Sequence, residues 1–230
     1  MLGLPAWLLP LTAALPTVRG DMISRFLPPA EGGRRSAVLA LFGEGPDGPD
    51  LLFIERAATM RSHAGQPAFP GGALDHEDGD PDGAGPVTAA LREAREEVGL
   101  EPGSVEVLGT LPDLWLPPSG FVVTPVIAWW RSPHRVHAVD RAEVASVARV
   151  PLSRLTDPEH RVTVRHPRGH IGPAFDTGAL LVWGFTAGVV DALLRLGGWE
   201  RPLDRARMQV LDPDAIALAA APEDRPLVDG

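Results

Sequence analysis

The chain contains no cysteine and no lysine among its 230 residues. Without thiols it can form no disulfide framework, no thiolate zinc site and no cysteine nucleophile. Apart from the histidines, its basic side chains are all arginines, they form no run, and the formal net charge is −9. Because a nucleic-acid-binding protein needs a basic patch to face the phosphates, we expect no nucleic-acid partner.

Long hydrophobic runs are also missing. The apolar stretch 178–190 ends at Asp191 and is shorter than the roughly 20 residues that a helix needs to cross a bilayer. It predicts instead a buried helix that continues through Leu196 and ends at Gly197 and Gly198. We therefore expect no membrane partner and a cytoplasmic location.

The first 20 residues resemble a signal peptide only in part. They have an apolar middle and small residues near Ala14, but they lack a basic n-region and contain three prolines. A signal peptide begins with positive charge. The favoured interpretation is a packed or lid-like amphipathic helix, with a secretory signal as the alternative.

The composition that is present is that of a globular protein, with 44% hydrophobic residues. A length of 230 residues suits one domain with terminal extensions. Apolar runs bounded by turn formers predict strands at 37–42, 51–54, 105–108, 121–130 and 162–164, of which the first two form a hairpin. Residues 140–147 are mixed and polar, and a helical turn is expected within 150–155. Strands and two helices in non-alternating order indicate an α+β domain with a mixed sheet.

The segment from Thr88 to Leu100 predicts a short amphipathic helix. Leu91, Ala94 and Val98 recur at helical spacing. Gly99 stands where a helix needs a residue with positive φ at its C-terminal end. The opposite face of this helix is therefore free for polar side chains.

Three glutamates occupy that face. Glu93, Glu96 and Glu97 are spaced i, i+3 and i+4, so their carboxylates share one side of the helix. Like charges at this spacing cost roughly 0.2–0.5 kcal/mol per pair, and carboxylates in the last turn oppose the helix dipole. Such a cluster suits a hard ion such as Mg²⁺ or Mn²⁺. The alternative is a solvated face in which Arg92 and Arg95 pair with the acids.

The stretch upstream of this helix identifies a family. Residues 69–72 read Phe-Pro-Gly-Gly, and 92–100 read Arg-Glu-Ala-Arg-Glu-Glu-Val-Gly-Leu. Together they resemble the Nudix box, the loop-helix-loop signature of the Nudix hydrolases, with Gly72 at its first position. The resemblance implies an α/β/α sandwich around the mixed central β-sheet.

One part of the box departs from the family pattern. Five residues separate Gly72 from Asp78, where the family has glutamate, and Glu77 lies beside it. Thirteen residues, 79–91, then precede Arg92, where the family has seven. Turn formers fill this insertion, and loop-closure entropy makes it cost only about 1 kcal/mol or less. Whether Glu77 or Asp78 serves the site is left open.

A second motif precedes the box. Arg56, Arg61 and Gly65 stand ahead of Phe-Pro-Gly-Gly at the spacing of the coenzyme A diphosphatase branch of the Nudix family. Arginines bind phosphate oxygens in a bidentate manner, and His63 adds a candidate donor. The substrate-binding residues expected are Arg56, Arg61, His63, Gly71 and Gly72. The resemblance covers about residues 35–203, which leaves 1–34 as an N-terminal extension and 204–230 as a loosely ordered tail.

The resemblance implies metal-dependent hydrolysis of a diphosphate. Glu93, Glu96 and Glu97 would hold Mg²⁺ or Mn²⁺, and a carboxylate would take the proton of the attacking water. Glu93 and Glu97 are the expected catalytic glutamates. Glu93 is the expected general base, and Glu143 is the rival base or an extra metal ligand. Arg92 would orient the glutamates.

The expected substrate is coenzyme A or an acyl-coenzyme A, cleaved to 3′,5′-ADP and (acyl-)4′-phosphopantetheine. Another nucleoside diphosphate, such as ADP-ribose or a dinucleotide, is the first alternative. A non-catalytic, nucleotide-binding Nudix protein is the second. A homodimer is the candidate assembly, and the sequence does not choose between assemblies.

Overall fold

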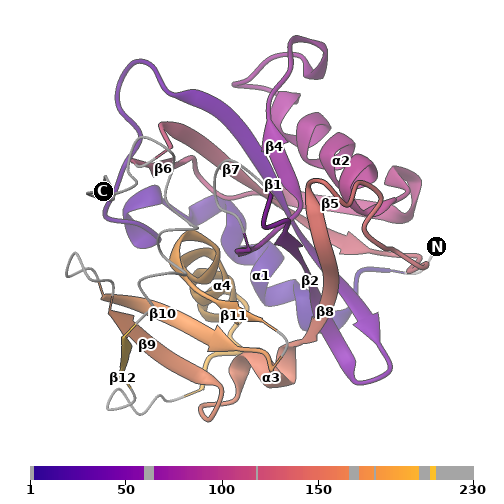
Figure 1. Cartoon of the computed structure of the whole chain (residues 1–230), viewed down its shortest axis with the longest axis vertical. Helices are drawn as coiled ribbons and strands as arrows, with labels where there is room; N and C mark the ends of the chain where they lie inside the picture. Colours follow the sequence, from indigo (N-terminus) through magenta and orange to yellow (C-terminus); the bar gives the residue numbers. More distant parts are fainter. Residues whose placement is uncertain are drawn as a thin grey trace, which may run out of the picture.

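The computed structural model describes residues 3–59, 65–117, 119–165, 171–178, 180–201 and 208–210 (Figure 1). Its helices are α1 (Leu9–Ala14), α2 (Gly85–Val98), α3 (Leu152–Thr156) and α4 (Gly184–Leu196). Its 3-10 turns are η1 (Ala6–Leu8), η2 (Leu15–Thr17), η3 (Gly20–Met22), η4 (His76–Asp78) and η5 (Pro102–Ser104).

The first strands are β1 (Arg34–Gly45), β2 (Gly48–Arg56), β3 (Pro67–Ala68), β4 (Gly71–Ala73), β5 (Val105–Thr110) and β6 (Leu114–Leu116). The later strands are β7 (Phe121–Trp130), β8 (Val144–Pro151), β9 (Arg161–Arg165), β10 (Ile171–Asp176), β11 (Leu181–Val182) and β12 (Met208–Val210). No described helix has both the length and the apolar character that crossing a membrane requires.

A mixed sheet forms the centre of the molecule. Its main strand order is β3-β2-β1-β7-β5, with β4 beside β1, β6 beside β7 and β8 beside β2. The predicted hairpin is confirmed, because β1 and β2 pair antiparallel. Strand β7 instead runs parallel to β1, so the sheet contains both orientations, as expected.

Strand β1 is buried on both faces, which explains why its sequence is a continuous apolar run. Ala37, Leu39 and Leu41 pack into the hydrophobic cluster that contains α2. Ala40 and Phe42, which point the other way, pack into the cluster that contains α1 and α4. The expected α/β/α sandwich is therefore confirmed: α2 covers one face of the sheet and α4 covers the other (Figure 1).

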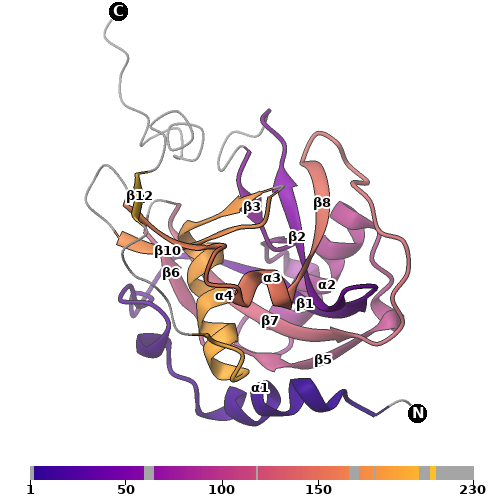
Figure 2. The same ribbon diagram turned by 90° about the horizontal axis from the view of Figure 1, so that it is seen from below.

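The N-terminal segment belongs to the α4 layer. Leu8, Leu11, Leu15 and Val18 are buried in the cluster of α4. Figure 2 shows α1 running beneath α4, while α2 lies on the other side of the sheet. The segment thus packs into the core, on the face of the sheet opposite the glutamates of α2.

Two sequence expectations were wrong. Strand β8 begins at Val144, inside the stretch read as mixed and polar, because its backbone pairs antiparallel with β2. Helix α4 begins at Gly184, since β11 (Leu181–Val182) pairs with β10 before the helix starts. The expected helical turn after 150 is α3, and the helix end near Gly197 is as predicted.

A second, smaller sheet has the strand order β11-β10-β9-β12. It includes the strand predicted at 162–164, which is β9. Residues 208–210, within the predicted C-terminal tail, form β12 and pair parallel with β9.

Candidate active site

Helix α2 presents the glutamates from a fixed position. It begins at Gly85, three residues before the predicted start, with Pro86 in its first turn, a position that needs no amide donor. It ends where predicted: Gly99 is left-handed, with φ +71°. Ala89, Ala90 and other small side chains are fully buried against the sheet, so the helix axis lies close to β1 and β4.

Glu97 is the most deeply placed of the three glutamates. The residue is 3% exposed, and its Oε2 accepts a hydrogen bond of 2.9 Å from the amide of Gly71. Burial raises the pKa of Glu97 to about 8, against the lowering effects of the Gly71 bond and Arg56. The negative charges of Glu93 and Glu143 add to the rise. The carboxylates of Glu97, Glu93 and Glu143 therefore interact electrostatically.

Glu93 lies one turn earlier, against the glycine pair of the box. A Cβ at Gly72 would collide with the Glu93 carboxylate, which explains the need for glycine there. Burial raises the pKa of Glu93, while a 2.9 Å hydrogen bond from Arg92 opposes that rise. Glu93 is therefore a half-buried carboxylate held by one arginine.

Arg92 joins the box loop to the glutamates. Its Nε and Nη2 donate to the two carboxylate oxygens of Asp78 at 3.0 and 2.9 Å. Its Nη1 donates to Glu93 and, at 3.3 Å, to Glu96, whose side chain is 61% exposed. The predicted orienting role of Arg92 agrees with these contacts.

The open question about Glu77 and Asp78 has a structural answer. The Asp78 side chain is 2% exposed, whereas Glu77 is exposed. The paired hydrogen bonds from Arg92 lower the pKa of Asp78. Of the two acids, Asp78 is therefore the one that contacts Arg92, and its role in the reaction remains a prediction.

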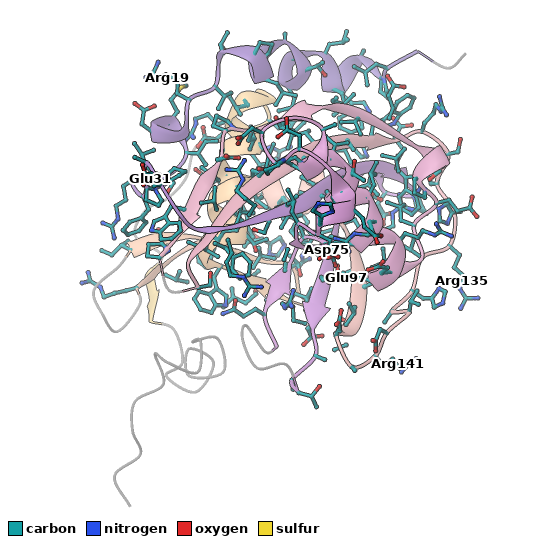
Figure 3. The ribbon with its side chains drawn as sticks, turned by 90° about the horizontal axis from the view of Figure 1, so that it is seen from above. Arg19, Glu31, Asp75, Glu97, Arg135 and Arg141 are labelled. Atoms are coloured by element: carbon teal, nitrogen blue, oxygen red, sulfur yellow. The ribbon has the colours of Figure 1, made fainter. Side chains whose placement is uncertain are left out.

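Asp75 is a residue of the site region that the sequence analysis missed. Together with Asp78 it forms a capping box around η4, in which the Asp75 amide donates to Asp78 Oδ2 at 2.8 Å. The spacing of two acids three residues apart is the signal that could have revealed it. Figure 3 shows Asp75 and Glu97 well away from Arg19, which belongs to the N-terminal segment.

Glu143 and Arg56 come to the site from the ends of two paired strands. The register of β2 and β8 shifts between Glu55 and Arg56, an irregularity of the kind that re-aims side chains beside active sites. The Ala57 amide then donates to the Glu143 carbonyl at 2.8 Å. Both Glu143 and Arg56 act on the pKa of Glu97, so the structure joins residues that are far apart in sequence.

The other predicted substrate-binding residues are two glycines of the box, Arg61 and His63. Gly71 has φ +154°, and a Cβ there would collide with the backbone of Ala37 in β1. Sheet geometry thus requires that glycine, and its amide serves Glu97. A role for Gly71 and Gly72 toward substrate remains a prediction. Arg61 and His63 lie outside the described residues.

The donor set suits a hard divalent cation. In the described part of the chain, no three histidine, aspartate or glutamate side chains converge as they would around an ion. Mg²⁺, however, keeps several waters and needs only one or two carboxylates together with substrate phosphates. Glu93 and Glu97, mutually repelling and partly desolvated, fit that requirement, and Glu96 and Glu143 are the further carboxylates of the cluster.

Comparison with known proteins shows the family of this chain. A family model described as the NUDIX domain matches residues 33–170. The chain is 40% identical over 173 residues to "Uncharacterized Nudix hydrolase NudL" of Cronobacter sakazakii, covering 74% of this chain and 85% of that protein. A protein of the same name from Citrobacter koseri is 40% identical over 191 residues, with 77% and 94% covered.

Among solved structures, the fold resembles "Crystal structure of a Nudix Hydrolase from M. Smegmatis, RenU". The TM-score is 0.51 at 21% identity, and the match covers 76% of this chain and 92% of that chain. This likeness concerns the fold.

Proposed function

Since this chain belongs to the Nudix hydrolase family, we propose that it hydrolyses the diphosphate bond of coenzyme A or its thioesters. Water adds across the bridging P–O–P bond, and the products are 3′,5′-ADP and 4′-phosphopantetheine or its acyl form. The fold alone does not choose this substrate. The choice depends on the arginine motif that leads into the box.

The observation that supports this substrate is the placement of Arg56. Its charge is close enough to Glu97 to lower the pKa of that buried carboxylate. Its Nε is buried and has no hydrogen-bond partner among the described residues. A guanidinium with a spare donor beside a carboxylate cluster suits a phosphate oxygen. Arg61 and His63 would extend this contact.

The glutamates have distinct roles in the proposed reaction. Glu93 and Glu97, with Glu96, would hold Mg²⁺ or Mn²⁺. When bound, the cation neutralises the diphosphate charge and lowers the pKa of water. Asp78 holds Arg92, and Arg92 in turn keeps Glu93 and Glu96 in place. The carboxylates therefore need little reorganisation during turnover.

A carboxylate takes the proton of the attacking water. Glu93 is the first candidate because it is half-buried and its pKa is raised, which moves a carboxylate toward the range of an effective base. Glu143 is the second candidate, since it is exposed and near the same charges. The pH–rate profiles of Glu93→Gln and Glu143→Gln separate the two: loss of the acidic limb identifies the base.

The decisive experiment is incubation of the full chain with coenzyme A and Mg²⁺ or Mn²⁺, with products identified by mass. We expect 3′,5′-ADP and 4′-phosphopantetheine, and a higher kcat/KM than with ADP-ribose or a dinucleotide. Dephospho-coenzyme A, which lacks the 3′-phosphate, is the matched control. Better turnover of ADP-ribose would reject the coenzyme A assignment and favour the alternative nucleotide.

Arg61→Ala tests the arginine motif more narrowly. We expect it to raise KM for coenzyme A more than it lowers kcat, because it removes binding shared by the ground and transition states. Unchanged constants would remove Arg61 from the site. Tight binding of coenzyme A by the wild type, without metal-dependent hydrolysis, would instead support a non-catalytic protein.

The same proposal places the protein in the cytoplasm with a small-molecule substrate. A homodimer is the candidate assembly. Analytical ultracentrifugation of the purified chain measures its oligomeric state directly.

A further inference from the structure

The insertion that distinguishes this box is tied to the sheet by one arginine. Arg35, the second residue of β1, donates from Nη2 to the carbonyl of Pro81 at 2.8 Å and to the Asp82 carboxylate at 3.2 Å. Both acceptors lie in residues 79–84, the loop between η4 and α2. The same arginine's carbonyl accepts the amide of Leu74 at 2.9 Å.

The other side of the Arg35 guanidinium is held by Asp113, which is itself bonded to β7. Nη1 donates to Asp113 at 2.6 Å, and the other Asp113 oxygen accepts the hydroxyl of Thr124 in β7 at 2.6 Å. Thr124 is 5% exposed. The guanidinium is therefore fixed before it meets the loop, and it can act as a rigid anchor.

The anchored loop leads directly to the catalytic cluster. One end of residues 79–84 is covalently attached to Asp78, which accepts both hydrogen bonds from Arg92. At the other end, the Gly85 amide donates to the Asp80 carbonyl at 2.9 Å and α2 begins. Figure 1 shows this loop at the outer end of α2. A displacement of the loop therefore acts first on Asp78 and, through the paired hydrogen bonds, on the Arg92 side chain that holds Glu93.

The residues that Arg35 holds are those by which this box exceeds the family length. Thirteen residues separate Asp78 from Arg92, and 79–84 are the ones that precede the helix. Their removal leaves seven residues, the family spacing stated above. A box without these residues has no such loop to fix.

We propose that Arg35 is a positioning residue for Glu93, acting through residues 79–84 and the Asp78–Arg92 pair. This inference rests on the proposed hydrolase function. Arg35 does not touch the carboxylates, and its effect passes through the loop that it holds against the sheet.

A double-mutant comparison tests the proposal. In the full chain, Arg35→Gln should lower kcat about tenfold with KM changed less than about twofold. It should also weaken Mn²⁺ binding to the substrate-free protein by about tenfold, measured from the free-ion signal in electron paramagnetic resonance. In a chain that lacks residues 79–84, the same substitution should change kcat and Mn²⁺ binding less than about twofold.

Two further variants keep the test decisive if the deletion does not fold. Asp82→Ala removes only a loop acceptor, so it should lower kcat in the same direction, and its effect should not add to that of Arg35→Gln. Arg34→Gln is the matched control, because Arg34 stacks on the Phe121 ring and has no contact with the loop among those the structure gives; it should retain full activity.

Different failures have different meanings. Equal loss from Arg35→Gln with and without the loop, or full additivity with Asp82→Ala, would place its effect in the Asp113 contact and overturn the proposal. An unaffected Arg35→Gln chain would do the same. A wild type that hydrolyses no pyrophosphate-linked nucleotide would reject the proposed function, while the Mn²⁺ titrations would still decide the role of Arg35.

Discussion

The amide of Gly71 and the carboxylate of Glu97 lie 2.9 Å apart, and this bond joins the glycine turn of the box to the last turn of its helix. The turn and the helix are separated by the insertion in sequence, yet they meet at this bond. Because Glu97 is buried there with a raised pKa, its ionised form is unfavourable, and the divalent cation that we propose would favour that form.

Glu97→Gln removes this charge. We expect turnover to fall about 100-fold or more, because the site loses one of its charged donors, while circular dichroism stays unchanged. Glu106→Gln, an exposed acid on β5, is the control and should keep full activity. Near-normal activity of Glu97→Gln would remove Glu97 from the metal site.

The same variant makes a pH-dependent prediction for stability without metal. The pKa of Glu97 rises from 4.5 to about 8 on folding, so the folded state holds the extra proton. The wild type therefore loses stability as pH rises from about 4.5 toward 8. Glu97→Gln should have a higher Tm than the wild type at pH 9 and a similar Tm near pH 4 in thermal melts with chelator. A constant difference would contradict the assigned pKa.

Asp78→Asn breaks the paired hydrogen bonds from Arg92. We expect kcat to fall about tenfold or more, as for other groups that orient catalytic ligands, with Glu77→Gln as the adjacent control that changes nothing. The pKa of Asp78 is lowered from 3.8, so its stabilising effect is present above that value and is lost as the pH falls further. The difference in Tm between wild type and Asp78→Asn should shrink accordingly. If Asp78→Asn and Glu77→Gln lowered kcat equally, the hydrogen bonds between Asp78 and Arg92 would not be the cause.

Gly72→Ala places a methyl group against the Glu93 carboxylate. We expect a loss of kcat with little change in Tm, since Gly72 has no positive φ and the side chain that must move is polar. Gly71→Ala should instead lower Tm, because its Cβ meets the backbone of β1. Gly188→Ala, with open space around it in α4, is the control. If Gly72→Ala kept full activity, Glu93 would not need its present position.

Leu11→Ala tests the N-terminal segment. Leu11 is fully buried beside α4, and a cavity there should cost about 2–5 kcal/mol in the free energy of unfolding. Leu9→Ala, 53% exposed on the same helix, should cost less than about 0.5 kcal/mol. Denaturant titration of both variants measures the difference, and equal costs would show that the segment does not pack as described.

The sequence predicted the central elements because their signals are local. The apolar run of β1, the helical spacing that ends at Gly99 and the box residues Glu93 and Glu97 all carry short-range patterns. Strand β8 was missed because the polar residues at 140–143 precede it, and because its antiparallel pairing with β2, about 90 residues earlier, leaves no local signal. Neither the Asp113 partner of Arg35, 78 residues away, nor the approach of Glu143 to Glu97 has any local signal.

The parallel pairing of β1 with β7 has a consequence for synthesis. In the first nine residues of β1, each residue pairs with one 87 positions later, from Arg34 with Phe121 to Phe42 with Trp129. A growing polypeptide can form the β1–β2 hairpin early, but one edge of β1 stays open until β7 has left the ribosome. Such distant contacts fold slowly and expose strand edges to aggregation, so this edge of β1 is the one most open to intermolecular pairing during that interval.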